Sequence, residues 1–147
     1  MKILLAGGGT GGHFYPIIAV ARSLRELAER ERIARMDLIL MSDATYDAQM
    51  LREEGIIFKK SPAGKLRRYF SLMNLVDILK TGLGVFRALW NLFWEMPDAI
   101  FIKGGYAAFP ALVGGVFFRI PILVHESDAV PGLVNRWAGR FARRSAI

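Results

Sequence analysis

The sequence predicts an α/β domain, a parallel β-sheet with helices on both faces. Short apolar runs alternate with longer amphipathic segments along the chain. Strands that alternate with helices are joined by crossover connections, and such connections give a parallel sheet. The 147 residues suit one domain, and we find no internal repeat, low-complexity tract or interdomain linker. We therefore expect a single domain over residues 1–147.

The first half of the chain supplies three expected strands and two expected helices. Residues 2–6 are a short apolar run that ends in glycines, as a buried strand entering a tight turn does. Residues 14–30 predict a helix because their apolar residues recur at helical spacing. Residues 36–41 are a second buried strand, and a short helix around 46–54 separates it from a third strand at 56–60.

The second half repeats the alternation. Residues 99–102 and 122–125 predict two further strands. Residues 109–118 between them are expected to be helical, with a proline in the first turn. Residues 132–143 predict an amphipathic helix, and residues 145–147 resemble the start of another strand.

Composition excludes several kinds of site. There is no cysteine, so a disulfide framework, a thiolate metal site and a cysteine nucleophile are excluded. The longest uncharged stretch, residues 3–21, is broken by a glycine run, His13 and Pro16. A membrane-spanning helix needs about 20 mostly apolar residues, so none is predicted, and no signal peptide is expected.

The net charge of +7 is concentrated in two segments. Residues 59–94 carry seven basic side chains against one acid, and residues 136–147 carry four arginines and no acid. Large apolar and aromatic residues are interleaved with the first cluster, which is too much apolar surface for a nucleic-acid face. Two interpretations remain: a helical hairpin or kinked helix that touches an anionic membrane, or a crossover helix packed on the sheet. The expected membrane contacts are Lys65, Arg67, Arg68, Phe70, Trp90 and Trp94.

Three unusual segments follow expected strands directly. They are residues 7–13, 103–106 and 125–128. Ligands of parallel α/β sheets bind beyond the carboxyl ends of the strands, at the point where the strand order reverses. We therefore expect these three segments to meet in one cleft.

The glycine run contains the pattern G-x-G-x-x-G at Gly7, Gly9 and Gly12. Glycines let the backbone approach an anion, and the following helix N-terminus favours negative charge. A dinucleotide site would also need an acid near the end of the second strand, for which Asp43 is the candidate. A P-loop is excluded because His13 stands where that motif has lysine.

The two histidines are candidates for acid–base chemistry. His13 is expected in the first turn of a helix, where the dipole favours the neutral imidazole that can act as a general base. His125 and Glu126 either pair as base and orienter or satisfy backbone groups at a strand end. Together with Asp128 they lack the spacing of a metal site, so no metal is predicted.

Three segments together resemble the MurG family, within glycosyltransferase family 28. The first is Ala-Gly-Gly-Gly-Thr-Gly-Gly-His-Phe-Tyr-Pro at residues 6–16. The second is Gly-Gly-Tyr at 104–106 with Pro110, and the third is His-Glu-Ser-Asp-Ala-Val-Pro-Gly-Leu-Val-Asn-Arg at 125–136. They occur in order and at matching spacing over essentially the whole chain.

The resemblance implies the N-terminal half of a GT-B fold, in which two Rossmann-like domains face one another across a cleft. It also implies inverting transfer of N-acetylglucosamine from UDP-GlcNAc to the muramyl C4 hydroxyl of lipid I, an acceptor with a polyprenyl diphosphate. No cofactor is implied. The implied partners are an anionic membrane and a donor-binding domain or chain, at the cytoplasmic face of the bacterial inner membrane.

The family's site residues map onto this sequence one by one. His13 would be the base or orienter of the acceptor hydroxyl. The implied contacts with the lipid diphosphate or the donor are Thr10, Gly11 and Gly12. The implied lining of the acceptor cleft is Gly104, Gly105, Tyr106, His125 and Glu126. Asp128 would contact the donor where the family commonly has an amide, and its carboxylate lacks the NH₂ donors of that amide.

Two other functions remain open at this point. A non-catalytic subunit that recruits a separate donor-binding chain to the membrane would also use the basic, aromatic segment. An NAD(P)-binding domain would use the glycine pattern but would leave the 125–132 segment unexplained.

Overall fold

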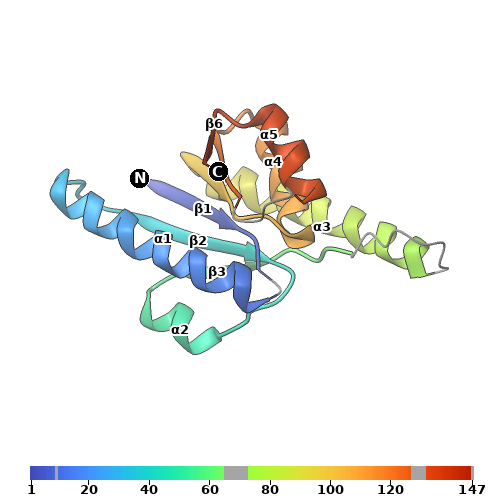
Figure 1. Ribbon diagram of the computed structural model, residues 1–147, viewed down its shortest axis with the longest axis horizontal. Helices are drawn as coiled ribbons and strands as arrows, with labels where there is room; N and C mark the ends of the chain where they lie inside the picture. The colour runs from blue at the N-terminus through green and yellow to red at the C-terminus, as the bar shows by residue number, and fades with distance from the viewer. Residues whose placement is uncertain (9, 65–72, 127–131, 147) are drawn as a thin grey trace.

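The computed structural model describes residues 1–8, 10–64, 73–126 and 132–146 (Figure 1). Within these ranges, one parallel sheet has the strand order β3-β2-β1-β4-β5-β6. Its strands are β1 (Lys2–Ala6), β2 (Asp37–Ser42), β3 (Ile57–Lys60), β4 (Ala99–Ile102), β5 (Ile122–His125) and β6 (Arg144–Ala146). The helices are α1 (Gly11–Arg30), α2 (Ala48–Glu53), α3 (Met73–Glu95), the 3₁₀ turn η1 (Tyr106–Ala108), α4 (Phe109–Phe117) and α5 (Leu133–Phe141).

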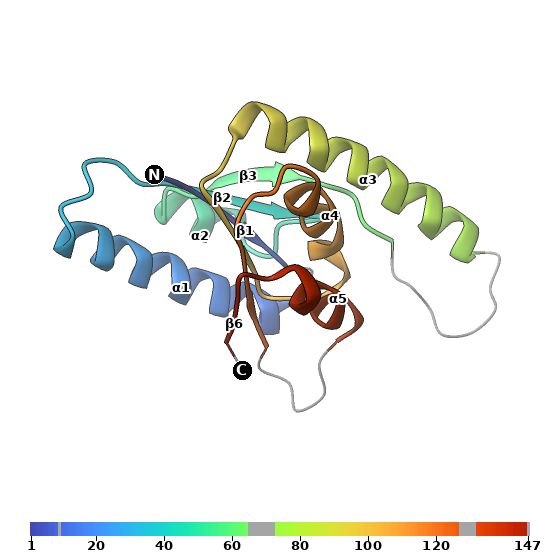
Figure 2. The ribbon, with the colours of Figure 1, turned by 90° about the horizontal axis from the view of Figure 1, so that it is seen from above.

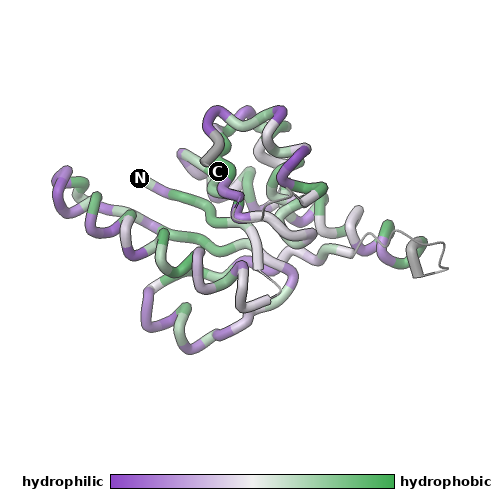
Figure 3. The backbone as a smooth tube through the Cα atoms, in the orientation of Figure 1, coloured by the Kyte–Doolittle hydropathy of each residue, from purple (hydrophilic) through white to green (hydrophobic). Residues whose placement is uncertain are grey.

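Two apolar clusters cover the two faces of the sheet. On one face, Phe14 and Ile17 of α1 and Leu51 of α2 pack against strand side chains. On the other face, Leu92 of α3 and Ala138 of α5 pack, together with α4, against the alternate strand residues. Figure 2 shows α1 apart from the group formed by α3, α4 and α5. In Figure 3 the central strands are hydrophobic along their interior, whereas α1 alternates between hydrophobic and hydrophilic, as expected for a buried strand and an amphipathic helix.

The strand order identifies where a ligand site belongs. The chain moves outward from β1 through β2 to β3 and then returns to place β4 on the other side of β1. The order therefore reverses between β1 and β4, and the segments that follow these two strands lie side by side. These segments are the glycine run and the Lys-Gly-Gly-Tyr segment.

Two expectations about helices need correction. Helix α1 begins at Gly11, three residues before the expected start, because Thr10 has extended backbone angles and the last glycines already form the first turn. The sequence leaves open a hairpin or kinked helix and a crossover helix for the basic segment. Residues 73–95 form a single helix rather than a hairpin, and its Ala88 and Leu92 are buried against the sheet, as in a crossover helix. Its glycine at position 84 is a packing site rather than a break, since a Cβ there would overlap the carbonyl oxygen of Pro62.

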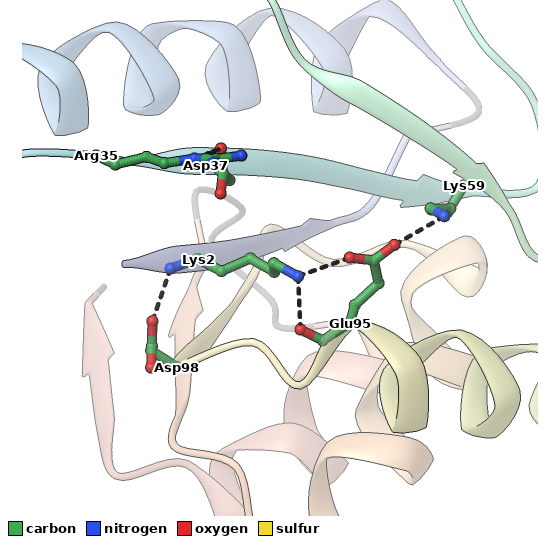
Figure 4. Close-up of polar contacts among 6 residues, drawn as sticks. All are labelled: Lys2, Arg35, Asp37, Lys59, Glu95 and Asp98. Atoms are coloured by element: carbon green, nitrogen blue, oxygen red, sulfur yellow. Dashed lines mark hydrogen bonds and ion pairs between the residues drawn. The ribbon is translucent and has the colours of Figure 1, made fainter.

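Ion pairs fasten α3 to the sheet (Figure 4). The Glu95 carboxylate accepts from Lys2 Nζ and from Lys59 Nζ, each at 2.8 Å, so one acid links α3 to β1 and β3. These two hydrogen-bonded ammonium groups lower the pKa of Glu95 below its usual value. The backbone N–H of Lys2 also donates to Asp98 at 2.6 Å.

Candidate functional site

Gly7 and Gly8, directly after β1, are buried and tolerate no larger side chain. Gly7 and Gly8 have φ values of +146° and +116°, a region that L-residues rarely adopt. A Cβ on Gly8 would lie 2.7 Å from Ser42 Oγ, and one on Gly7 would lie 3.2 Å from the Gly104 carbonyl oxygen. The loop therefore touches both neighbouring strand ends through its main chain.

The N-terminus of α1 presents exposed backbone beyond this loop. Thr10 and Gly12 are exposed, and Gly11 is partly exposed. A Cβ on Gly12 would meet no other atom within 4 Å. The first N–H groups of a helix have no partner within the helix and favour an anion. The first turn of α1 thus offers peptide donors to a ligand at the reversal point of the sheet.

His13 is held between this turn and the loop after β4. Its Nδ1 lies 2.9 Å from Thr10 Oγ1, a hydrogen bond that fixes the ring. Its Nε2 faces Gly105, where a Cβ would be 3.5 Å away. Gly105 has φ +79° and leads into η1. The structure therefore brings together two segments that are far apart in the sequence.

Asn135 clamps the ends of β4 and β5, a role that the sequence does not predict. Its side chain is 7% exposed, and its Nδ2 donates to Glu126 Oε2 at 2.8 Å and lies 3.4 Å from the carbonyl oxygens of Lys103 and His125. Its side chain also fills the space beside Gly104, where a Cβ would lie 2.6 Å from Nδ2. The feature of the sequence that could have indicated this role is a polar residue, Asn135, on the buried side of α5, three positions before Ala138.

Glu126 and His125 sit at the end of β5 with different surroundings. Glu126 is 8% exposed, and its Oε2 also accepts from the backbone N–H of Gly132 at 3.2 Å. This arrangement favours the interpretation that Glu126 satisfies polar groups at the strand end and the start of α5. His125 is half-buried, and its ring lies 6.2 Å from that of Phe101, between centroids. No hydrogen bond between His125 and Glu126 side chains is found in the described part of the chain.

Tyr106 and Asp43 connect the carboxyl ends of β4 and β2. The Tyr106 hydroxyl donates to Asp43 Oδ2 at 2.9 Å, and Ser42 Oγ donates to Oδ1 at 3.3 Å. Partial burial and the adjacent Asp43 carboxylate raise the pKa of Tyr106 to about 12. Asp43, the candidate ribose ligand of a dinucleotide site, thus has both carboxylate oxygens engaged within the protein.

Several expected contacts cannot be placed. Lys65, Arg67, Arg68, Phe70 and Asp128 lie outside the described residues. Trp90 and Trp94 are described, and they lie on α3 with 57% and 66% of their surface exposed. Their rings form an edge-to-face pair with centroids 5.9 Å apart.

Helix α3 carries an unusually large exposed apolar surface, which we call the α3 face. Its members are Leu75, Val76, Ile78, Leu79, Leu83, Phe86, Trp90, Phe93 and Trp94. In the described ranges, no helix is long and apolar enough to cross a membrane. Nor do three or more potential ligand residues there gather as a metal site would require.

The comparison with protein families shows to which family the chain belongs. Residues 3–147 match the Glycosyltransferase family 28 N-terminal domain. The chain belongs to glycosyltransferase family 28.

Relatives in this family share the whole length of the chain. It is 35% identical over 147 residues to the UDP-N-acetylglucosamine–N-acetylmuramyl-(pentapeptide) pyrophosphoryl-undecaprenol N-acetylglucosamine transferase of Clostridium tetani. It is 38% identical over 146 residues to the transferase of the same name from Legionella pneumophila (strain Corby). In both cases the match covers 99% of this chain and 39% of the relative. The chain thus spans about two fifths of the length of these family 28 enzymes.

Solved structures confirm the fold. MurG of Acinetobacter baumannii superimposes with a TM-score of 0.71 at 23% identity, over 98% of this chain and 39% of that one. The glycosyltransferase SsfS6 of Streptomyces sp. SF2575 gives 0.60 at 15% identity, over 95% and 43%. The expected Rossmann-like sheet, as the N-terminal half of a GT-B glycosyltransferase, is therefore correct.

Proposed function

We propose that this family 28 domain is the acceptor-binding half of a transferase. The transferase moves N-acetylglucosamine from UDP-GlcNAc to the C4 hydroxyl of the muramyl sugar in lipid I, with inversion. The observation that carries this proposal is the junction of the α1 N-terminus, His13 and Gly105 at the reversal point of the sheet. The activity named for the relatives, which are 35% and 38% identical over the whole chain, supports the substrate pair.

The first turn of α1 suits a diphosphate. Thr10, Gly11 and Gly12 offer backbone N–H groups and the positive end of the helix dipole, and the two glycines have no side chain that would block an anion. We assign Gly104, Gly105 and Tyr106, which follow β4, to the opposite side of the acceptor site. We assign the lipid diphosphate to this turn, and the donor, with Asp128 as a contact, to the side that a second domain would close.

His13 is assigned as the general base. In this role it carries its proton on Nδ1 and donates a hydrogen bond to Thr10 Oγ1, which leaves the lone pair on Nε2, the ring nitrogen nearest Gly105. That lone pair takes the proton of the acceptor hydroxyl as the C4 oxygen attacks the anomeric carbon of the donor and UDP leaves. The hydrogen bond to Thr10 holds the imidazole ring in place for this step.

The α3 face is proposed as the membrane contact. Exposed aromatic rings of Phe86, Trp90 and Trp94 are of the kind that settle at a bilayer interface, and Arg87 adds positive charge beside them. A lipid acceptor requires its transferase at the leaflet that holds the lipid. The proposal therefore assigns the domain to the cytoplasmic face of the bacterial inner membrane, with Lys65, Arg67, Arg68 and Phe70 as further contacts.

Transfer from UDP-GlcNAc to a lipid I analogue tests the proposal, with this chain joined to a donor-binding domain. We expect His13→Gln to lower kcat by about 10²–10⁴-fold, the usual contribution of a general base. Thr10→Val should give a smaller loss, because the imidazole remains but the hydrogen bond that holds its ring is removed.

The matched control is Ser23→Ala, an exposed position on the same helix, which should keep full activity. A loss of only a few-fold in His13→Gln would contradict the base assignment. Absence of transfer by the unaltered enzyme with this donor and acceptor would contradict the proposed function itself.

A further inference from the structure

A hollow of about 260 Å³ lies beside the candidate site, between α3, η1 and α5. Its wall on the α3 side is Thr81 with Gly64, and its wall on the α5 side is Leu133, Val134 and Trp137. Tyr106 and Phe109 complete the lining. Figure 2 shows α3 and α5 on the same side of the sheet as α4, so the hollow is on the face opposite α1. No residue of the assigned chemistry except Tyr106 belongs to it.

The polar groups of the lining have partners within the protein. Thr81 Oγ1 accepts from the backbone N–H of Gly64 at 3.0 Å and donates to the Asp77 carbonyl oxygen at 2.7 Å. The Tyr106 hydroxyl is bonded to Asp43. Among the described residues, the rest of the lining is hydrocarbon and aromatic. A ligand with hydroxyls or amides in this space would lose its bonds to water without replacement, whereas an apolar ligand loses nothing.

The volume of the hollow and its position next to Tyr106 further restrict which ligand could bind there. A water molecule takes about 30 Å³ in the liquid, so the hollow is several times larger than a hydration site and approaches the lower end of small-ligand pockets. Tyr106 lines the hollow and directly follows Gly105, the residue beside His13. A molecule with its anionic group at the first turn of α1 could thus extend an apolar chain past Tyr106.

We propose that this hollow binds the first isoprene units of the acceptor, the part of the polyprenyl chain next to the diphosphate. The inference rests on the proposed function and adds a subsite to it. The sugar and the peptide of the acceptor are excluded from the hollow by their polar groups. The distal polyprenyl chain stays in the bilayer, and the hollow holds only its start.

Calorimetric titration of the chain with geranyl diphosphate and with inorganic diphosphate tests the subsite. We expect geranyl diphosphate to bind about tenfold tighter or more, because each methylene removed from water contributes favourably. Its binding should also show the more negative heat-capacity change of apolar burial. Equal affinity for the two probes would overturn the proposal.

Two variants test whether the affinity difference between the two probes arises in the hollow. Leu133→Trp fills the hollow and should reduce the affinity ratio of the two probes to about one, while inorganic diphosphate binds as before. Leu123→Trp is the matched control: it enlarges a leucine of similar exposure, 40% against 49%, on β5 away from the hollow, and should keep the ratio. Equal effects of the two variants would contradict the assignment.

A third variant separates the hollow from the membrane contact. Trp90→Ala removes a large part of the α3 face and should leave the ratio unchanged. A ratio lost in Trp90→Ala but kept in Leu133→Trp would place the prenyl chain on the α3 face instead and reject the subsite.

The two probes and the transfer assay together also show whether the subsite or the proposed function is the proposal that fails. If the probes bind alike while the joined enzyme still transfers N-acetylglucosamine, the subsite is rejected and the proposed function stands. If geranyl diphosphate binds tightly but the joined enzyme transfers nothing, the subsite is supported and the proposed function is rejected.

Discussion

At the scale of single residues, the hydroxyl of Tyr106 joins two strand ends that are far apart in the sequence. Tyr106→Phe removes this bond and leaves Asp43 Oδ2 without its donor. We expect a loss of about 1 kcal/mol in the free energy of unfolding, the typical value for one hydrogen bond. Urea denaturation at pH 7 measures it. Tyr46→Phe, at a tyrosine that is 53% exposed, is the control and should be near neutral.

The same residue gives a spectroscopic prediction. Because the folded protein raises the pKa of Tyr106 to about 12, its neutral phenol is favoured in the folded state. The stabilisation is therefore complete below the ordinary pKa of 10.0 and is lost as pH rises through about 12. Ultraviolet titration should resolve one late phenol, and that step should be absent in Tyr106→Phe. Ionisation of all the tyrosines together in the folded protein would contradict it.

At the scale of elements, the strands were predictable because each is a short apolar run with a marked end. The bounds of β1, β4 and β5 agree with the expectation from sequence. The long helix was harder, since the sequence left a hairpin or kinked helix and a crossover helix as alternatives, and the contact between Gly84 and Pro62 depends on the tertiary fold. The Asn135–Glu126 and Tyr106–Asp43 bonds could not be predicted, because they depend on which strand ends are neighbours. Periodicity along one segment carries no such information.

The α3 face supplies the prediction at this scale. The double variant Trp90→Ala, Trp94→Ala removes two exposed aromatic rings, and we expect it to reduce binding to anionic phospholipid vesicles about tenfold or more. Sedimentation with vesicles measures the partition. Tyr15→Ala, an exposed aromatic on α1, is the control on the opposite face of the sheet and should bind as the unaltered chain does. Unchanged partition of the double variant would contradict the assignment of the α3 face as the membrane contact.

At the scale of the whole molecule, Glu95 couples α3 to two strands. Its pKa is lowered, so its ionised form stabilises the fold; this contribution is present above the usual value of 4.5 and is lost as pH falls through the lowered value. We expect Glu95→Gln to lower Tm at pH 7 by about 3 °C, as about 1 kcal/mol would in a domain of this size.

The pH dependence provides the decisive comparison for Glu95. The unaltered chain should lose more stability than Glu95→Gln as pH falls from about 5 to about 3, since the variant has no carboxylate to protonate at this position. Glu29→Gln, at an exposed position of α1, should follow the unaltered chain. Parallel pH profiles for the unaltered chain and Glu95→Gln would show that the two ion pairs contribute nothing to the fold.

The glycines that follow β1 and β4 have a consequence for inhibition and resistance. Gly7, Gly8 and Gly104 are buried and Gly105 is partly exposed, and all four residues have φ values between +79° and +146°. Any other amino acid at these positions would strain the backbone, and at Gly8 and Gly104 a Cβ would also collide with a neighbouring side chain. A compound that binds at the exposed first turn of α1 would rest on this backbone, which point mutations can hardly alter. Resistance would have to arise at exposed side chains nearby, such as Tyr46, whose hydroxyl lies beside Gly11.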